Sequence, residues 1–218
     1  MKACELNTWK VSPNEAVAIQ NRLAPCVNRE GAPQNVRLVA GIDVALPDGV
    51  TRAAVVIDSF PLLTPIACAT ADCPIDFPYV PGLLSFREAP AIVAACKKIT
   101  AEPDLVIVDG QGIAHPRHLG IASHIGLILD VPTIGCAKSL LVGKHEPVGE
   151  KRGDWQPIIY KAEVVGAALR TRPGTKPVFV SIGNKISLES AIHWVITCCG
   201  RYRLPEPQRQ AHRAAGSA

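Results

Sequence analysis

The sequence predicts an α/β protein built on a mixed sheet, with antiparallel strands first, parallel strands after them and helices on the faces of the sheet. Two β-branched apolar runs, at residues 36–46 and 53–60, flank the turn Pro47-Asp48-Gly49, which is typical of an antiparallel hairpin. A continuous apolar run at residues 104–108 leads into a glycine-rich turn, a helical pattern and a further short strand at 131–135. Strand, turn, helix and strand in this order predict a βαβ unit with parallel strands.

Capping residues and proline positions define the other elements. Ser12, Pro13 and Glu15 are typical of a helix start and precede apolar residues at helical spacing. A third strand is expected at residues 63–71, and the prolines within residues 77–82 make that segment a stiff loop, because proline fits neither a helix interior nor a central strand. The remaining predicted segments are helices at 83–99 (started or kinked by Pro90), 116–129 and 187–198, a polar loop at 143–157, and apolar segments at 158–169 and 178–181.

Composition excludes several classes of protein. The chain has 218 residues, of which 48% are hydrophobic and 19% charged, so we expect one globular domain over residues 1–218 and no disordered or fibrous chain. No uncharged apolar run approaches the ~20 residues of a membrane helix, and the first ten residues do not read as a secretion signal. We therefore expect a cytoplasmic protein without membrane contact. The eight cysteines contain no C-x-x-C pair and are expected to be reduced, mostly buried thiols.

The formal net charge of +4 favours binding to a polyanion without demonstrating it. Arginines crowd a basic C-terminal tail that starts at about residue 201, and a second group of cations lies between residues 138 and 152. The alternative interpretation of such clusters is an ordinary solvated surface.

Three acidic residues stand where a carboxylate is costly unless it has a partner. Asp43 interrupts an apolar strand, Asp109 ends the buried strand at 104–108, and Glu88 lies at the break that Pro90 marks. If the strands of Asp43 and Asp109 are neighbours, both carboxylates reach one crevice at the carboxyl ends of the strands. Clustered oxygen ligands without histidine or thiolate partners suit magnesium or manganese, and hence phosphate chemistry. The alternatives are a turn-capping Asp109 and a salt-bridged Asp43.

Three further side chains are candidates for binding substrate beside this crevice. His115 opens a predicted helix, and Lys138 follows the strand at 131–135, from which it can reach a phosphate. Tyr79 lies in the proline-stiffened loop, where it suits a wedge or a stacking platform for nucleic acid. Each has an ordinary alternative: a capping histidine, a surface lysine, and a tyrosine packed against the sheet.

These residues lie in motifs that resemble the endonuclease V family. The resemblance spans most of the chain in order, and its longest motif, residues 77–88, is highly specific. The matching segments are residues 40–44, 77–88, 108–117, 120–124, 131–135, 137–139 and 203–207.

The resemblance implies a ribonuclease H-like fold and a magnesium-dependent nuclease that nicks DNA carrying deoxyinosine, one bond beyond the lesion on its 3′ side. Manganese is a possible substitute for magnesium, the protein is expected to be a monomer, other deaminated bases are possible lesions, and some members act on inosine in RNA. By motif, Asp43, Asp109 and Glu88 would hold the metal, and Lys138 and His115 would stabilise charge or position the scissile phosphate. The implied wedge consists of Tyr79, Val80, Pro81 and Gly82, and the implied base pocket of Gly82, Leu84, Gly110, Ile121 and Leu141.

One position departs from the family. Asn184 stands where the family usually has a histidine that is counted among its active-site residues. An amide cannot act as a general base near neutral pH, so full activity is in doubt at this position. Three functions follow: a repair endonuclease for deaminated DNA, which we favour, a lesion-binding protein with weakened catalysis, or an inosine-directed ribonuclease.

Overall fold

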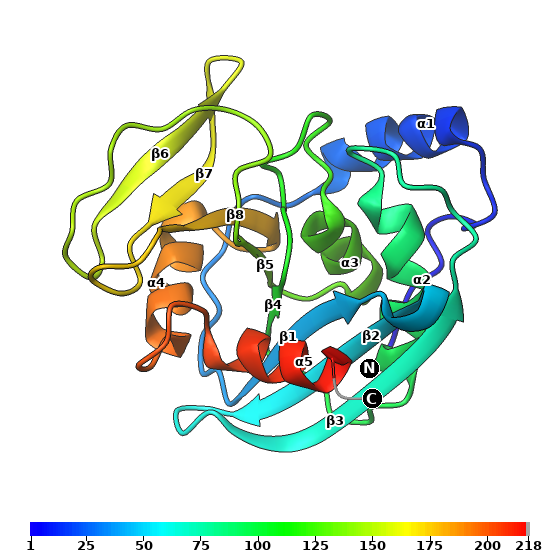
Figure 1. Ribbon diagram of the computed structural model, residues 1–218, viewed down its shortest axis with the longest axis horizontal. Helices are drawn as coiled ribbons and strands as arrows, with labels where there is room; N and C mark the ends of the chain where they lie inside the picture. Colours follow the sequence, from blue (N-terminus) through cyan, green and yellow to red (C-terminus); the bar gives the residue numbers. More distant parts are fainter. Residues whose placement is uncertain (217–218) are drawn as a thin grey trace.

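A single eight-stranded sheet runs through the part of the chain that the computed structural model describes, residues 1–216. The strands lie in the order β3-β2-β1-β4-β5-β8-β7-β6 (Figure 1). In chain order they are β1 Leu38–Ala45, β2 Val50–Ser59, β3 Thr64–Pro74, β4 Leu105–Val108, β5 Thr133–Ala137, β6 Trp155–Tyr160, β7 Glu163–Leu169 and β8 Val178–Asn184. The predicted mixed sheet is confirmed: β1, β2 and β3 pair antiparallel, whereas β4 pairs parallel to both β1 and β5.

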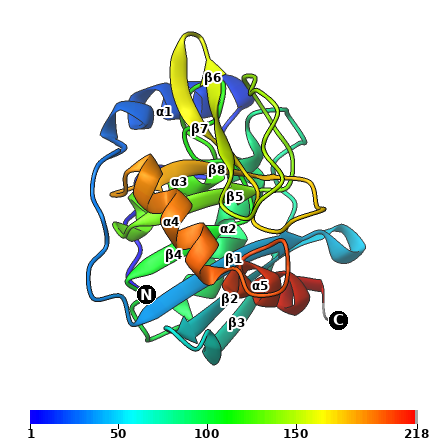
Figure 2. The ribbon, with the colours of Figure 1, turned by 90° about the vertical axis from the view of Figure 1, so that its left-hand side faces the viewer.

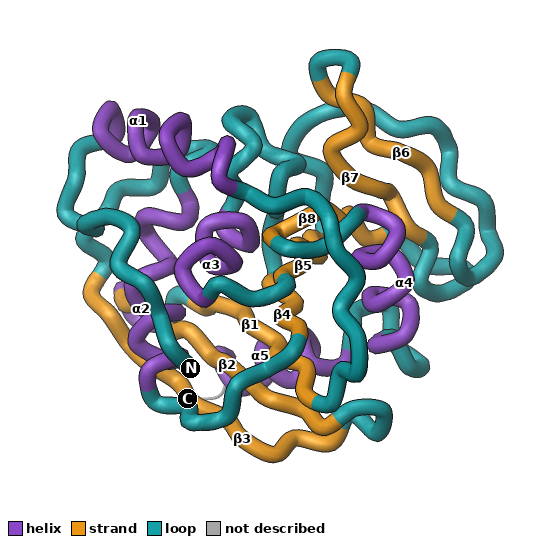
Figure 3. Tube along the Cα trace, turned by 180° about the vertical axis from the view of Figure 1, so that it is seen from behind, coloured by secondary structure: helices purple, strands orange, loops and turns teal. Residues whose placement is uncertain are grey.

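Helices cover both faces of this sheet. They are α1 Pro13–Leu23, α2 Leu84–Lys97, α3 Ile121–Leu129, α4 Leu188–Cys198 and α5 Glu206–Gly216, with short 3-10 turns at Ala24–Cys26 and Pro47–Gly49. Seen from behind, α2 and α3 lie in front of the sheet (Figure 3), whereas α4 and α5 cover the opposite face (Figure 1). The turn by 90° shows α5 lying along β1 and β2 (Figure 2).

Alternation along β1 divides the core between these two layers. Ala40 and Ile42 pack with α2 and α3, while Val39 packs with β4, β8 and α4 on the other side. Because side chains alternate across a strand, Asp43 shares the face of Val39, which is the face that α5 covers. The position of this one acid is therefore fixed by the period of the strand.

The N-terminal helix begins as its capping residues predict. The Ser12 side chain accepts a hydrogen bond from the Glu15 backbone, and the Glu15 carboxylate accepts one from the Ser12 N–H at 2.8 Å. This capping box, with Pro13 at the first helical position, fixes the start of α1.

Several boundaries differ from those the sequence predicts. The helix expected at 116–129 begins only at Ile121, because His118 has a left-handed backbone with φ of 54° that no helix continues. Pro90 lies inside α2 and does not start it, and β3 runs on to Pro74. Residues 158–169 belong to the hairpin of β6 and β7, and the basic segment from residue 201 contains the helix α5.

The cysteines are free thiols, as expected, but only half of them are buried. Cys96, Cys136, Cys198 and Cys199 are buried, whereas the other four are exposed or half-buried. Within residues 1–216, no helix is both long and apolar enough to cross a membrane.

Candidate active site

The crevice at the carboxyl ends of β1 and β4 holds two of the predicted acids. Asp43 lies near the end of β1 and Asp109 directly follows β4, and the parallel pairing of these strands brings both to one edge of the sheet. The Asp109 N–H donates to the Ile42 carbonyl oxygen at 2.9 Å, which ties the second acid to the strand of the first. Asp43 is only 6% exposed, and one of its oxygens accepts a hydrogen bond from the Val44 N–H.

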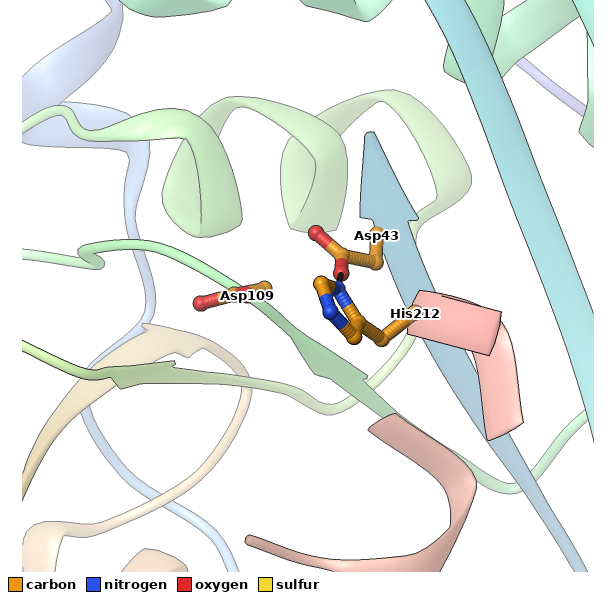
Figure 4. Close-up of side chains that lie close together, drawn as sticks. All are labelled: Asp43, Asp109 and His212. Carbon is orange, nitrogen blue, oxygen red and sulfur yellow. Dashed lines mark hydrogen bonds and ion pairs between the residues drawn. The ribbon is translucent and has the colours of Figure 1, made fainter. Parts of the chain in front are cut away.

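The C-terminal helix adds a third candidate ligand, which the sequence did not predict. His212 projects from α5 toward Asp43, and its Nδ1 lies 2.5 Å from the Asp43 Oδ2 (Figure 4). Ligand atoms of His212, Asp43 and Asp109 all lie within 4.8 Å of one another. The helix comes this close because Gly41 has no side chain: a Cβ there would stand 2.0 Å from the Pro207 carbonyl oxygen.

Glu88 lies near this acidic group, in the second turn of α2. It is half-buried, and burial together with the nearby charge of Asp43 raises the pKa of its carboxyl to about 8. Burial and the Asp109 carboxylate likewise raise the pKa of Asp43. Glu88 is close enough to share this electrostatic field, but it is not among the three residues whose ligand atoms converge.

Lys138 supplies a positive charge at the same place. It follows β5, the strand next to β4, and its Nζ forms an ion pair with the Asp109 Oδ2. The predicted neighbours Asp43, Asp109 and Lys138 are therefore brought together by the order of three adjacent parallel strands.

The donor set fits a divalent cation. Two carboxylates and one imidazole converge, and Lys138 pairs with Asp109 beside them. Burial, and then the neighbouring carboxylate charges, raise the pKa values of Asp43 and Glu88, so an added cation would relieve an unfavourable arrangement. Carboxylate oxygens suit magnesium and manganese, and an imidazole nitrogen extends the range to transition metals. The carboxylate cluster that the sequence predicts also has an imidazole beside it, because α5 folds back over β1.

A small cavity lies beside the acidic cluster. Its volume is about 120 Å³, well below the ~300–1,000 Å³ typical of sites for whole drug-sized ligands, so it suits a fragment such as one nucleobase. Gly82, Leu84, Ile121 and Leu141 line it, as the resemblance implies, together with Tyr79 and Val80 of the implied wedge. Gly110 is not among the lining residues but stands behind the wall, where a Cβ would meet the Ile121 side chain at 2.5 Å.

The implied wedge projects from a firmly anchored loop. Tyr79 is 70% exposed, so the alternative in which it packs against the sheet is wrong. Phe77, by contrast, is buried, and its ring centroid lies 5.7 Å from that of Phe86 in α2. The loop therefore holds its tip in solvent on a rigid base.

Three donors converge on one backbone carbonyl at the end of this loop. The Gly82 oxygen accepts hydrogen bonds from Gln20 Nε2 at 3.0 Å, His115 Nε2 at 2.9 Å and Arg117 Nη2 at 2.8 Å. Gly82 has a left-handed backbone with φ of 78°, a conformation that favours glycine. The rim of the cavity is thus held by side chains from α1 and from the segment before α3.

His115 belongs to this rim. Its Nδ1 accepts from the Arg117 N–H at 3.2 Å while its Nε2 donates to Gly82, and burial lowers the pKa of the imidazole to about 4. The ring is therefore neutral near pH 7, so it holds the rim and does not act as a cation toward a phosphate.

Asn184 is not brought to the acidic cluster. It pairs with Thr133 at the beginning of β5, whereas Lys138 follows the end of that strand, about 16 Å away along the backbone. Its Oδ1 accepts from the Asn28 N–H and its Nδ2 donates to the Gly126 carbonyl, both at 3.1 Å. The implied active-site role of position 184 is wrong for this geometry, since both polar atoms of the amide join backbone segments at the other end of the sheet.

Sequence reasoning also missed three contributors. No helix is predicted in the basic tail that carries His212, although Ala211 and Ala215 there have helical spacing, and Arg117 is an ordinary basic residue in sequence. Gln20 did carry a signal: it is a polar residue in line with the buried Ala16 and Leu23 of α1. A polar side chain on the buried stripe of a helix indicates a specific partner.

Comparison with known proteins agrees with this arrangement. The sequence model of the endonuclease V family matches residues 21–213. The endonuclease V of Gloeobacter violaceus is 50% identical over 212 residues, covering 95% of this chain and 86% of its own. The crystal structure of endonuclease V from Streptomyces avermitilis is 40% identical with a TM-score of 0.90, covering 95% of this chain and 93% of its own. Endonuclease V of Ciona intestinalis, in complex with a 24mer DNA containing an inosine followed by a ribo-adenosine, is 28% identical with a TM-score of 0.82, covering 93% and 95%.

The fold and the acidic cluster define a nuclease with a ribonuclease H-like fold, an enzyme that hydrolyses phosphodiester bonds in DNA. More specifically, the chain belongs to the endonuclease V family.

Proposed function

We propose that this protein is a metal-dependent endonuclease that recognises deoxyinosine in DNA and hydrolyses a phosphodiester bond on the 3′ side of the lesion, the first step of its repair. One observation carries the proposal: the turn after β4 joins a base-sized cavity to an acidic cluster. Asp109 belongs to the cluster, and the next residue, Gly110, packs against Ile121 in the cavity wall. A base held in the cavity therefore leaves its own phosphodiester beside the carboxylates.

The loop and the glycines prepare the substrate. Tyr79 and Val80 stand at the mouth of the cavity, where they fill the gap that an extruded base leaves in the stack. Gly120 precedes α3 without a side-chain cap, and both Gly120 and Ile121 line the cavity, so the start of this helix lets the backbone approach the base edge.

The charged side chains act at the phosphate. Lys138 neutralises charge that builds up on the phosphate oxygens, and its pairing with Asp109 holds it within reach of them. His212 shares a hydrogen bond with Asp43 through Nδ1, which leaves Nε2 directed to a water molecule or to the phosphate. Glu88 stands beside them with a carboxyl that retains its proton near pH 7 in the absence of a cation.

The metal that this donor set would hold is Mg²⁺, with Mn²⁺ as a substitute. Asp43 and Asp109 would be its principal ligands, with Glu88 and His212 beside them. There it would supply a Lewis acid for the phosphate oxygens and lower the pKa of a nucleophilic water molecule.

A nicking assay tests the proposal. A labelled duplex with one deoxyinosine is incubated with the protein and Mg²⁺, Mn²⁺ or a chelator, and the product is sized to locate the cut. We expect one nick on the 3′ side of inosine that depends on the cation. In Asp109→Asn, nicking should fall by at least about 10²-fold while binding to the inosine duplex persists, because the cavity and the loop remain intact.

The same assay separates the alternatives. Equal cutting of undamaged duplex would contradict lesion recognition, and binding without any nicking would favour a lesion-binding protein. Since the Ciona protein was crystallised with a ribo-adenosine after the inosine, matched substrates with a ribose or a deoxyribose at that nucleotide test for a preference for RNA.

A further inference from the structure

A second cavity opens on the side of the base cavity away from the acidic cluster. It has a volume of about 450 Å³ and lies between the end of α1 and the turn that joins β6 to β7. Four basic side chains and no acidic one line it, namely Arg29, Arg117, His118 and Lys161. We call it the cationic groove.

The charge of this groove is only partly neutralised. Among the described residues, one carboxylate lies against these cations, that of Glu163. It forms an ion pair with Arg29, and its Oε2 lies 3.8 Å from the His118 Nε2. Lys161 makes no ion pair with a described residue, and its Nζ lies 5.1 Å from the centroid of the Tyr160 ring. Three permanent cations therefore face one carboxylate, an arrangement that attracts a polyanion.

The groove is held in place by backbone geometry. Lys161 and Ala162 both have left-handed φ values, 51° and 64°, as in the two-residue turns that join antiparallel strands tightly. The Tyr160 ring also lies beside His118, with 6.4 Å between ring centroids. The turn thus presents its lysine from a defined position on the groove wall.

Arg117 connects the groove to the base cavity. It lines the groove, yet its guanidinium donates to the Gly82 carbonyl and to Gln20 Oε1, both in the wall of the base cavity. The acidic cluster adjoins the base cavity through Asp109 and Gly110, which packs against Ile121. In both ribbon views the β6–β7 turn and α5 lie at opposite ends of the molecule (Figures 1 and 2).

We propose that the cationic groove binds the phosphodiester backbone of the lesion strand on the 5′ side of the flipped nucleotide. This rests on the proposed function: if the strand is cut 3′ of the lesion at the acidic cluster, the strand that leaves the base cavity in the other direction is its 5′ flank. The groove recognises phosphate by charge alone, so it adds affinity and register without reading sequence.

The test measures the affinity of Lys161→Gln for an inosine duplex over a series of salt concentrations. The expected result is a Kd raised roughly three- to tenfold at low salt, with the slope of log Kd against log salt reduced by about one unit, as for the loss of one phosphate contact. The single-turnover nicking rate at saturating protein should equal that of the unmodified protein, because Lys161 is remote from the carboxylates of Asp43 and Asp109.

Two comparisons make the result specific. Lys176→Gln is the matched control, because Lys176 is an exposed lysine in the loop at the other end of β7.

The affinity loss of Lys161→Gln should disappear on a duplex that ends two base pairs 5′ of the inosine and persist on one shortened on the 3′ side. An equal loss in Lys176→Gln, an unchanged salt slope, or a loss that follows the 3′ flank would overturn the proposal. Nicking by the unmodified protein tests the proposed function separately.

Discussion

Asn184 has a structural role at a position where the family resemblance implies an active-site residue. Its amide joins Asn28, which follows α1, to Gly126 in α3, and it is buried with both polar atoms paired. The weakened-catalysis alternative depends on this residue, and its distance from the carboxylates removes that reason.

We therefore expect Asn184→Ala to lower the free energy of unfolding by about 1–3 kcal/mol, since a buried N–H and a buried carbonyl lose their partners. The single-turnover nicking rate of the folded protein should stay within about twofold of the unmodified rate, and Asn184→His should give no increase. Denaturant unfolding and nicking measured on the same preparations provide the two readouts. A tenfold faster Asn184→His would return this position to the active site.

Tyr79 is the opposite of Asn184: its side chain is exposed and its packing does not stabilise the fold. Its ring faces solvent, with the Arg87 guanidinium 5.9 Å from the ring centroid. Tyr79→Ala should reduce the preference for inosine duplex over undamaged duplex by about 1–3 kcal/mol, because a base contact with the ring is lost. Tyr79→Phe keeps the ring and should keep the preference. Competition binding with both duplexes measures it, and an unchanged preference in Tyr79→Ala would exclude the wedge role.

At the scale of elements, α5 is the part of the fold on which the site depends most. It brings His212 to Asp43 and packs directly on the backbone of Gly41. It also covers Asp58 of β2, which is fully buried and whose carboxyl oxygens have no hydrogen-bond partner among the described residues. Burial, and then the charge of Glu206 at the start of α5, raise the pKa of Asp58 to about 7.

This carboxyl makes the attachment of α5 sensitive to pH. The folded protein holds the Asp58 proton more tightly than the unfolded chain, so the free energy of unfolding should fall as pH rises from about 4 to about 7 and then level off. Between pH 5 and pH 8 the Asp58 contribution amounts to about 3 kcal/mol, and Asp58→Asn should remove it. Urea unfolding at several pH values measures the slope. Asp130→Asn, at an exposed site, should keep the slope of the unmodified protein, and an equally steep Asp58→Asn would refute the assignment.

For the whole molecule, the sequence predicted what local pattern and order along the chain determine. The hairpin of β1 and β2, the βαβ unit and the meeting of Asp43 with Asp109 and Lys138 all follow from strand periodicity and from parallel neighbours. His212 and Gln20 depend on helices at the two ends of the chain that pack across the sheet and the loop, and no local pattern specifies such contacts. The helix predicted at 116–129 starts later because His118 has a left-handed backbone, which the apolar pattern does not reveal.

The acidic cluster also links cation binding to the stability of the entire fold. A cation that binds the folded protein alone stabilises it by about 2.7 kcal/mol at a concentration of one hundred times its Kd. For a chain of this size, thermal unfolding should shift upward by roughly 5–10 °C when Mg²⁺ is added to chelator-treated protein. Asp43→Asn should lose most of this shift, because it removes one of the two carboxylates that converge with His212. Asp130→Asn, whose carboxylate pairs with Lys185 at the surface, should respond as the unmodified protein does. Calorimetric scans of the three proteins with and without Mg²⁺ make the comparison, and an equal shift in Asp43→Asn would place the cation elsewhere.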